Sequence, residues 1–150
     1  MLLCLDCFRV YNQKTIKNNM CKVKNCYGYV VEIDELFVSV IAELNRKGYG
    51  TIACCSSHFD SNSHNAYSSY IYFDDEYNFP NLPNGYMYDQ DLYPWVDWVG
   101  HGRHKKTTIR IQFDKNKSLN EMSKDIINNA VNVLEWAEGL ESLREMEKGN

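Results

Sequence analysis

The sequence predicts an α+β fold in which a cysteine-rich N-terminal segment precedes a small, mostly antiparallel sheet packed by two helices. Three observations lead to this prediction. Four of the six cysteines lie within the first 26 residues, two segments repeat apolar residues at helical spacing, and three short segments have the residue content of strands. Because the three strands lie between the two helices instead of alternating with them, helices on one face of the sheet are expected.

The cysteine-rich segment contains two close cysteine pairs. Two residues separate Cys4 from Cys7, four separate Cys21 from Cys26, and thirteen lie between the pairs. Such pairs form tight turns that direct two thiolates the same way, and a short span lets the turns face each other around Zn²⁺. Bound metal would fold a segment too small to build its own core. The sequence thus predicts a zinc ribbon over 1–32, with free thiols, a disulfide and an iron–sulfur cluster as alternatives.

A second domain is predicted over 33–150, and it begins with a helix over 34–47. Asp34 is a suitable N-cap, and Gly48 follows the last turn as helix-ending glycines do. The apolar side chains recur at three- and four-residue steps, so they form one stripe that packs against a sheet. This stripe consists of Ile33, Leu36, Phe37, Val40, Ile41 and Leu44.

The sheet is predicted from strands at 51–55, 68–73 and 107–113. Alternation places Tyr70 and Tyr72 opposite Ile71 and Phe73, and it places Ile109, Ile111 and Phe113 inward and Thr108, Arg110 and Gln112 outward. The last helix opens with the capping box of Ser118 and Glu121 and is expected to reach about Ala137. Residues 140–147 are a candidate continuation.

A long aromatic insertion is predicted at 74–106, between the second and third strands. It holds all three prolines and two of the three tryptophans, so no long regular element is expected there. Loops of this length inside compact domains are usually functional.

Composition limits the classes of function. The hydrophobic content of 44% is ordinary for a globular protein. The net charge of −4 disfavours non-specific electrostatic binding to duplex nucleic acid. No apolar run approaches the roughly 20 residues of a membrane span. The first residues lack the features of a signal peptide, and zinc-like cysteine spacing fits a reducing compartment, so a cytoplasmic location is expected.

A candidate ligand site follows the first strand of the sheet, at Cys54-Cys55-Ser56-Ser57-His58. Amides and small hydroxyls at strand ends can receive an anionic or nucleotide ligand, aromatic rings can stack a base, and arginines can neutralise phosphates. The candidate ligand-binding residues are Cys55, Ser56, Ser57, His58, Tyr70, Trp95, Trp98, Arg103 and Arg110. Packing of the cysteines and tryptophans in the core accounts for the same pattern equally well.

Three alternatives stay open. The ribbon is basic, as expected of an adaptor for nucleic acid or protein, through Lys14, Lys17, Lys22 and Lys24. Cys55 with His58 as its base would give an enzyme acting on RNA or a nucleotide, although no third group orients the pair. A second metal would use Cys54 or Cys55 with His58, His64, His101 or His104. Phosphate-loop, dinucleotide, nucleophile-elbow and zinc-deaminase motifs are missing, which favours a non-catalytic protein.

These motifs together resemble small zinc-ribbon proteins of Firmicutes and their phages. The ribbon, segments 31–36 and 42–49, and the cluster at 54–58 carry the resemblance, which extends over about 4–85. The cluster usually reads Cys-Cys-Ser-Gly-His in that family, so Ser57 stands where glycine is usual. A serine disfavours a left-handed turn, which counts against any role that needs such a turn there. A Tyr-Ile-x-Phe strand and an aromatic–proline stretch, here 70–73 and 79–83, also match.

The resemblance implies a phage-encoded protein with bound Zn²⁺ in the host cytoplasm. Phage proteins of this size that are rich in aromatic residues and lack catalytic sets resemble anti-defence factors that sequester nucleotide immune signals. A small nucleotide-like ligand is therefore the expected partner. The cluster is also similar to the Ser-x-Cys-Ser-Gly loop of wybutosine-synthesis enzymes, which act on transfer RNA. Exposed aromatic residues often mark interfaces, so a homo-oligomer is a further expectation.

Overall fold

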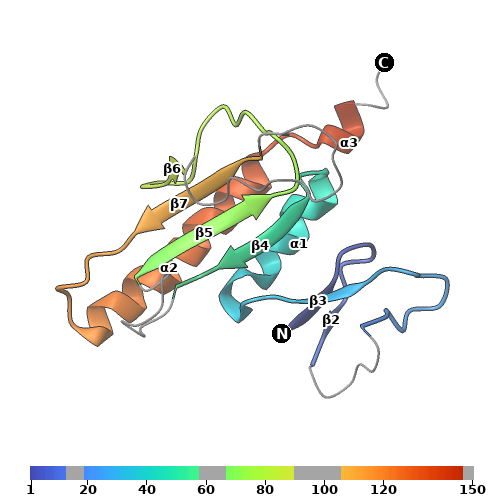
Figure 1. Cartoon of the computed structure of the whole chain (residues 1–150), viewed down its shortest axis with the longest axis horizontal. Coiled ribbons are helices and arrows are strands. Elements are labelled where there is room, and N and C mark those ends of the chain that lie inside the picture. The colour runs from blue at the N-terminus through green and yellow to red at the C-terminus, as the bar shows by residue number, and fades with distance from the viewer. Residues whose placement is uncertain (13–18, 58–66, 90–105, 147–150) are drawn as a thin grey trace, which may run out of the picture.

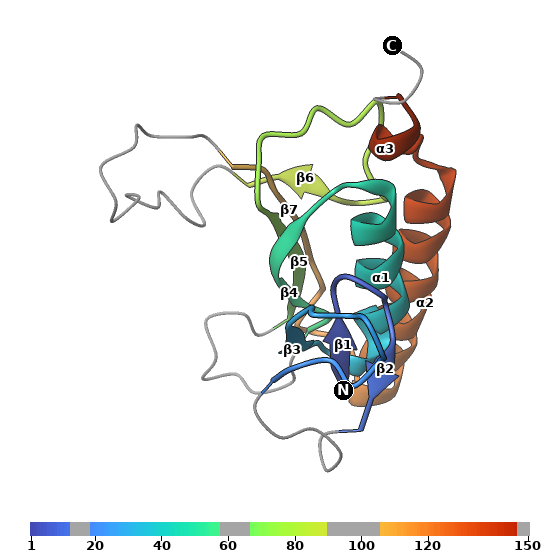
Figure 2. The ribbon, with the colours of Figure 1, turned by 90° about the vertical axis from the view of Figure 1, so that its right-hand side faces the viewer.

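The computed structural model describes residues 1–12, 19–57, 67–89 and 106–146. It confirms the α+β prediction: a small N-terminal sheet precedes a four-stranded antiparallel sheet, and two long helices pack against each other (Figure 1). Both helices lie along one face of the larger sheet, as a view from the side makes clear (Figure 2). None of the helices in the described part is long and apolar enough to cross a membrane.

The N-terminal sheet has three short strands, β1 (Leu2–Cys4), β2 (Val10–Tyr11) and β3 (Val30–Glu32), in the order β2-β1-β3. Both neighbours of β1 run antiparallel to it. The side chain of Leu3, in the central strand, is fully buried in the main hydrophobic core. The small sheet is therefore joined to the rest of the molecule by apolar packing as well as by the chain.

The first predicted helix is confirmed at both ends. It consists of a 3₁₀ turn, η2 (Glu35–Phe37), followed by α1 (Val38–Lys47). Asp34 caps it by accepting the Leu36 N–H at 3.4 Å, and Gly48 ends it with φ 97°. Leu36 was predicted in the buried stripe, but 42% of it is exposed. The tighter 3₁₀ turn changes the phase of the first residues, so the α-helical spacing does not apply to Leu36.

The larger sheet has the strand order β4-β5-β7-β6 and is antiparallel throughout. Its strands β4 (Thr51–Cys55), β5 (Ser68–Phe73) and β7 (Thr108–Gln112) match the three predictions. A fourth strand, β6 (Met87–Tyr88), lies inside the predicted insertion and pairs with β7. Sequence reasoning missed it because two residues are too few for any periodicity.

Both faces of the sheet are buried at its centre. Ile71 and Ile109 are paired across β5 and β7 and are fully buried in the core with the helices. By alternation Tyr70, Tyr72 and Thr108 point to the other face, as predicted, yet they are also buried. The prediction of which residues share a face is thus confirmed, and the face away from the helices is covered at these positions.

The last helix, α2 (Leu119–Gly139), starts as predicted. The Glu121 N–H donates to Ser118 Oγ at 3.4 Å, and the Ser118 N–H donates to Glu121 Oε2 at 3.0 Å, which completes the capping box. The candidate continuation forms a separate short helix, α3 (Leu143–Met146). Near the end of α2 the indole of Trp136 donates to Asn81 O at 3.0 Å, so α2 also fixes the first part of the insertion.

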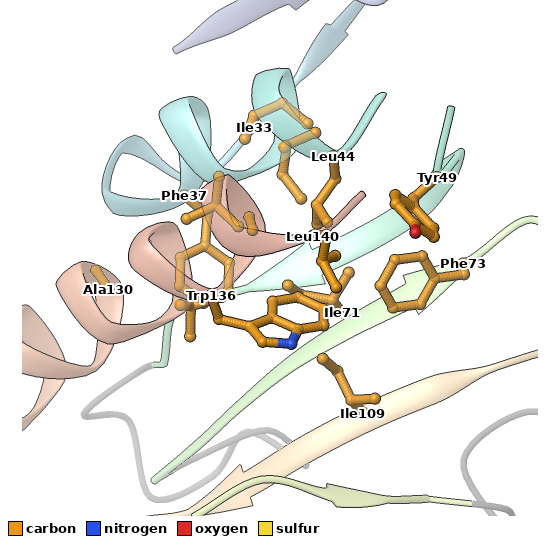
Figure 3. Packing of buried hydrophobic residues seen from close by; sticks show 14 of the residues in the cluster. Ile33, Phe37, Leu44, Tyr49, Ile71, Phe73, Ile109, Ala130, Trp136 and Leu140 are labelled. Atoms are coloured by element: carbon orange, nitrogen blue, oxygen red, sulfur yellow. The ribbon is translucent and has the colours of Figure 1, made fainter. Parts of the chain in front are cut away.

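The core lies between α1, α2 and the four-stranded sheet (Figure 3). Phe37 and Leu44 from the first helical segment meet Ile71 from β5, and Trp136 packs against them from α2. Aromatic rings continue the core toward the insertion: Phe79 lies 5.1 Å from Phe73 and 5.0 Å from Trp136 between ring centroids. Tyr77, also from the insertion, belongs to this cluster.

A buried lysine connects the two helices. Lys47, at the last turn of α1, donates from Nζ to Glu138 O at 2.5 Å and to Leu140 O at 2.6 Å. Carbonyl groups at the C-terminus of a helix have no partner within the helix and carry partial negative charge. Lys47 therefore caps α2 from the neighbouring helix.

We expect Lys47→Met to lower the free energy of unfolding by about 2 kcal/mol, because two charge-assisted hydrogen bonds are removed while the apolar stem is kept. Lys124→Met, at an exposed position of α2, is the matched control and should change stability by less than about 0.5 kcal/mol. Urea denaturation followed by circular dichroism measures both. Equal stability of the two variants would contradict the capping role.

Candidate metal centre and sheet rim

The four N-terminal cysteines converge on one point. Their sulfur atoms all lie within 4.8 Å of one another, with Sγ–Sγ distances of 3.7 Å for Cys4–Cys26 and 3.5 Å for Cys7–Cys21. Sulfurs at the corners of a tetrahedron around Zn²⁺, with bonds of about 2.3 Å, are about 3.8 Å apart. The cluster could therefore hold a metal ion such as zinc. The same distances are far longer than the roughly 2.05 Å of a disulfide bond, and all six cysteines are free.

Each cysteine pair sits on a turn with one left-handed residue. In the first, the Phe8 N–H donates to Cys4 O at 2.9 Å and Phe8 has φ 57°. In the second, the Cys26 N–H donates to Val23 O at 3.0 Å and Asn25 has φ 65°. These positive φ values reverse the chain within a few residues, and both thiolates of a pair thereby point to the same side.

The two turns touch at Gly28. A Cβ atom at this position would lie 2.7 Å from Cγ of Asp6, which is closer than real Cβ atoms approach another carbon. The Gly28 carbonyl also accepts the Cys21 N–H at 3.0 Å. A glycine is therefore required where the second turn passes the side chain of the first.

Hydrogen bonds surround the sulfur of Cys21. Tyr11 Oη lies 3.0 Å from it, and the Val23 N–H donates to it at 3.4 Å. Burial raises the pKa of the Cys21 thiol, but these donors and the neighbouring thiols outweigh burial and lower it to about 6. Donors that favour the thiolate also favour metal binding, because the thiolate is the ligand.

The pKa values of Cys26 and Cys7 are shifted in the opposite direction, upward. The Gly28 N–H favours the Cys26 thiolate, yet burial and the neighbouring sulfurs raise its pKa to about 12. Burial is also the main reason that the pKa of Cys7 is raised. Like charges this close repel, and a divalent ion removes the repulsion. Four thiolates without an open position are typical of a structural metal site rather than a catalytic one.

The second predicted site lies at the rim of the larger sheet, where β4 ends. The strand register aligns Cys55 with Tyr70 and Tyr70 with Arg110, so three predicted ligand-binding residues share the face away from the helices. Cys55 and Tyr70 are buried, with 3% and 7% of their surface exposed. Ser56 is buried as well, and its N–H donates to Asp34 Oδ2 at 3.2 Å.

Several residues predicted for the ligand site, for the alternative second metal site and for the basic ribbon fall outside the part of the chain that the structure describes. They are His58, Trp95, Trp98 and Arg103 of the ligand site, His64, His101 and His104 of the alternative second metal site, and Lys14 and Lys17 of the basic ribbon.

Ser57 has an unusual backbone and an unpaired hydroxyl. Its φ is 131°, in the region that favours glycine, and its Oγ is buried with no hydrogen-bond partner. Such a conformation costs a residue with a Cβ about 1–3 kcal/mol. The left-handed backbone conformation, which a serine disfavours, is therefore present at position 57, and the backbone there is strained.

Arg110 lies on β7, which is separated by β5 from β4 and the turn that follows it. Its Nε is 3.2 Å from Asp89 Oδ2 but makes no hydrogen bond, and its guanidinium lies 5.9 Å from the centroid of the Tyr70 ring. The Ser57 N–H bonds the thiol of Cys55, and the positive charge of Arg110 acts on the same thiol. The rim thus combines the Arg110–Asp89 ion pair with two buried atoms, Ser57 Oγ and Arg110 Nε, that make no hydrogen bond.

The rim thiols are not activated for nucleophilic attack. Burial raises the pKa of Cys55, and it raises the pKa of Cys54 to about 12. A nucleophilic cysteine needs a lowered pKa, because only the thiolate attacks. These shifts count against the hypothesis that Cys55 is catalytic.

Three residues of the two sites were given no such role from the sequence. Tyr11 supports the sulfur cluster, Asp89 pairs with Arg110, and Asp34 was predicted only as a helix cap although it also holds Ser56. Sequence spacing gave no signal for the first two, because each contact joins two separate segments of the chain.

No protein-family model, no curated protein and no solved structure matches this chain. The assignment of the sites therefore rests on the residues and on their geometry.

We expect Tyr11→Phe to weaken Zn²⁺ binding by about tenfold, because the variant lacks the hydrogen bond that favours the Cys21 thiolate. Removing that bond also raises the pKa of Cys21, so acid should release the metal at a higher pH than in the wild type. Competition with a chromophoric chelator measures both effects. Tyr27→Phe, at a ring that is 81% exposed, is the control. Equal affinities for the two variants would show that Tyr11 does not support the site.

We expect Ser57→Gly to raise the free energy of unfolding by about 1 kcal/mol, since relief of strain exceeds the added entropy of the unfolded chain. Ser57→Ala removes the unpaired hydroxyl but keeps the Cβ. Comparing the two variants therefore separates the cost of backbone strain from the cost of burying the hydroxyl. Thermal unfolding of both variants tests this. A Ser57→Gly variant less stable than the wild type would contradict the strain.

Proposed function

We propose that the chain is a non-catalytic binding protein with a structural zinc ribbon, whose sheet rim takes a small, anionic, nucleotide-like ligand. The observation that carries the proposal is the pair of buried atoms at the rim that make no hydrogen bond. Within the described part of the chain, no side-chain nitrogen or oxygen other than Ser57 Oγ and Arg110 Nε is buried without a hydrogen-bond partner.

Burial without a hydrogen bond costs a polar group about 1–3 kcal/mol. Ser57 Oγ makes no hydrogen bond, and Arg110 Nε has only its ion pair with Asp89, so a bound acceptor would stabilise both groups. A hydroxyl and a guanidinium N–H are suited to phosphate or carboxylate oxygens, which accept charge-assisted hydrogen bonds. The nearby Tyr70 ring, which packs against the guanidinium, holds Arg110 in place. An anionic ligand is therefore supported over a neutral or cationic one.

Backbone strain at Ser57 supports the same location. Strained residues persist where the surrounding structure holds them, and they concentrate at ligand sites. The neutral thiols of Cys54 and Cys55 favour binding without covalent chemistry. The four-sulfur cluster favours Zn²⁺ over a disulfide, and its closed set of ligands favours a structural role.

The biological role in this proposal comes from the resemblance to phage zinc-ribbon proteins. A protein that binds a nucleotide-like signal and does not convert it would act by sequestration, here in the cytoplasm of an infected host. This role requires an affinity high enough to compete with the host receptor for the signal.

Calorimetry of the zinc-loaded protein with a panel of mononucleotides and cyclic dinucleotides tests the proposal. At least one ligand should bind, and Arg110→Gln should weaken it about tenfold or more, because the variant cannot form the charge-assisted hydrogen bond. Asp89→Asn should strengthen it, since a competing carboxylate is removed. Lys115→Gln, an equal change of charge at an exposed position, is the control.

Absence of binding across the panel, with folded and zinc-loaded protein, would overturn the proposed ligand. Binding that Arg110→Gln and Lys115→Gln reduce equally would place the ligand elsewhere on the molecule.

A further inference from the structure

The hairpin that carries Cys21 and Cys26 presents two aromatic rings to solvent. Tyr27 is 81% exposed and Tyr29 is 70% exposed, the two highest values among the large apolar side chains of the described residues. Single exposed apolar residues need no explanation, but two rings on one short arm form a surface. Neither ring is used by the metal centre or by the sheet rim.

The two arms of the hairpin are paired at Tyr29. Met20 is bridged to Tyr29, and the flanking hydrogen bonds, Cys21 N–H to Gly28 O at 3.0 Å and Val30 N–H to Asn19 O at 2.9 Å, make them a non-hydrogen-bonded pair. Side chains of such a pair lie side by side on the same face.

Lys22 and Tyr27 are the next exposed residues toward the tip on the two arms. Cys21, which follows Met20, contributes its sulfur to the four-cysteine cluster. The cluster therefore lies at the base of the hairpin, and Met20, Lys22, Tyr27 and Tyr29 are exposed to solvent around it. Lys24 is exposed at the tip.

Charge separates this end of the molecule from the rest. Residues 1–32 contain five basic and two acidic side chains, whereas the remainder contains eleven basic and eighteen acidic ones. The segment stays positive even after the two negative charges that a zinc tetrathiolate would add. An aromatic surface flanked by lysines, on an otherwise acidic protein, is complementary to a polyanion that has accessible flat rings.

We propose that this hairpin surface binds single-stranded nucleic acid, with bases stacked on Tyr27 and Tyr29 and phosphates near Lys22 and Lys24. Two residues along an extended arm are about 6.6 Å apart, which leaves room for a separate base on each ring. Bases in a duplex already stack on one another and leave no face free, so single strands are favoured. This surface is distinct from the rim and does not depend on the ligand proposed there.

Fluorescence anisotropy with labelled oligonucleotides of about twelve residues, as single-stranded RNA, single-stranded DNA and duplex, tests the proposal on the zinc-loaded full chain. The single strands should bind more tightly than the duplex, with an affinity that falls as salt is raised. The Tyr27→Ala/Tyr29→Ala variant should bind about tenfold more weakly or worse, because alanine offers no ring on which a base can stack. Tyr27→Phe/Tyr29→Phe keeps both rings and should bind as the wild type does.

The lysines are tested separately. Lys22→Gln/Lys24→Gln should lower the slope of log affinity against log salt by about 0.7 for each phosphate that is no longer neutralised. Lys115→Gln/Lys124→Gln makes the same change of charge at exposed positions outside the ribbon and should leave the slope unchanged. Zinc content and circular dichroism confirm that each variant is folded.

Three results would overturn the proposal: no binding of single strands at low salt, equal binding of the alanine and phenylalanine variants, or tighter binding of the duplex. Loss of single-strand binding in the rim variant Arg110→Gln, with the tyrosine variants unaffected, would assign the nucleic acid to the rim instead.

Discussion

The close approach of four sulfurs is the constraint on which the N-terminal sheet depends. Neighbouring sulfurs lower the pKa of Cys21 and raise that of Cys26, because two thiolates this close would repel. A divalent ion converts this repulsion into attraction. The free energy of binding then becomes free energy of folding for a segment whose strands are only two or three residues long.

This constraint extends beyond the ribbon because the ribbon and the main core share a strand. Leu3 and Cys4 are adjacent in β1 and both fully buried, one among the apolar side chains of the core and the other among the sulfurs. A shift of β1 that opened the metal site would also withdraw Leu3 from the core. Order in the two parts is therefore coupled.

Local patterns in the sequence predicted the parts of the fold that are determined locally. Helical spacing, the Asp34 cap and the glycine at 48 defined the first helix, and cysteine spacing identified the metal ligands. Features that depend on contacts between distant segments were missed. The burial of Tyr70 and Thr108, the strand at 87–88, and the pairing of Arg110 with Asp89 follow from how strands assemble. The spacing of apolar residues within one segment carries no information on which strands pair.

The segregation of charge along the chain has a kinetic consequence. An acidic body is repelled by any polyanion, whereas the basic ribbon is attracted, so the molecule experiences a torque as it approaches one. Screening limits this to separations of about 8 Å at physiological ionic strength, which is shorter than the protein itself. Encounters would therefore be productive mainly when the ribbon leads, and lowering the ionic strength would strengthen both the attraction at one end and the rejection at the other.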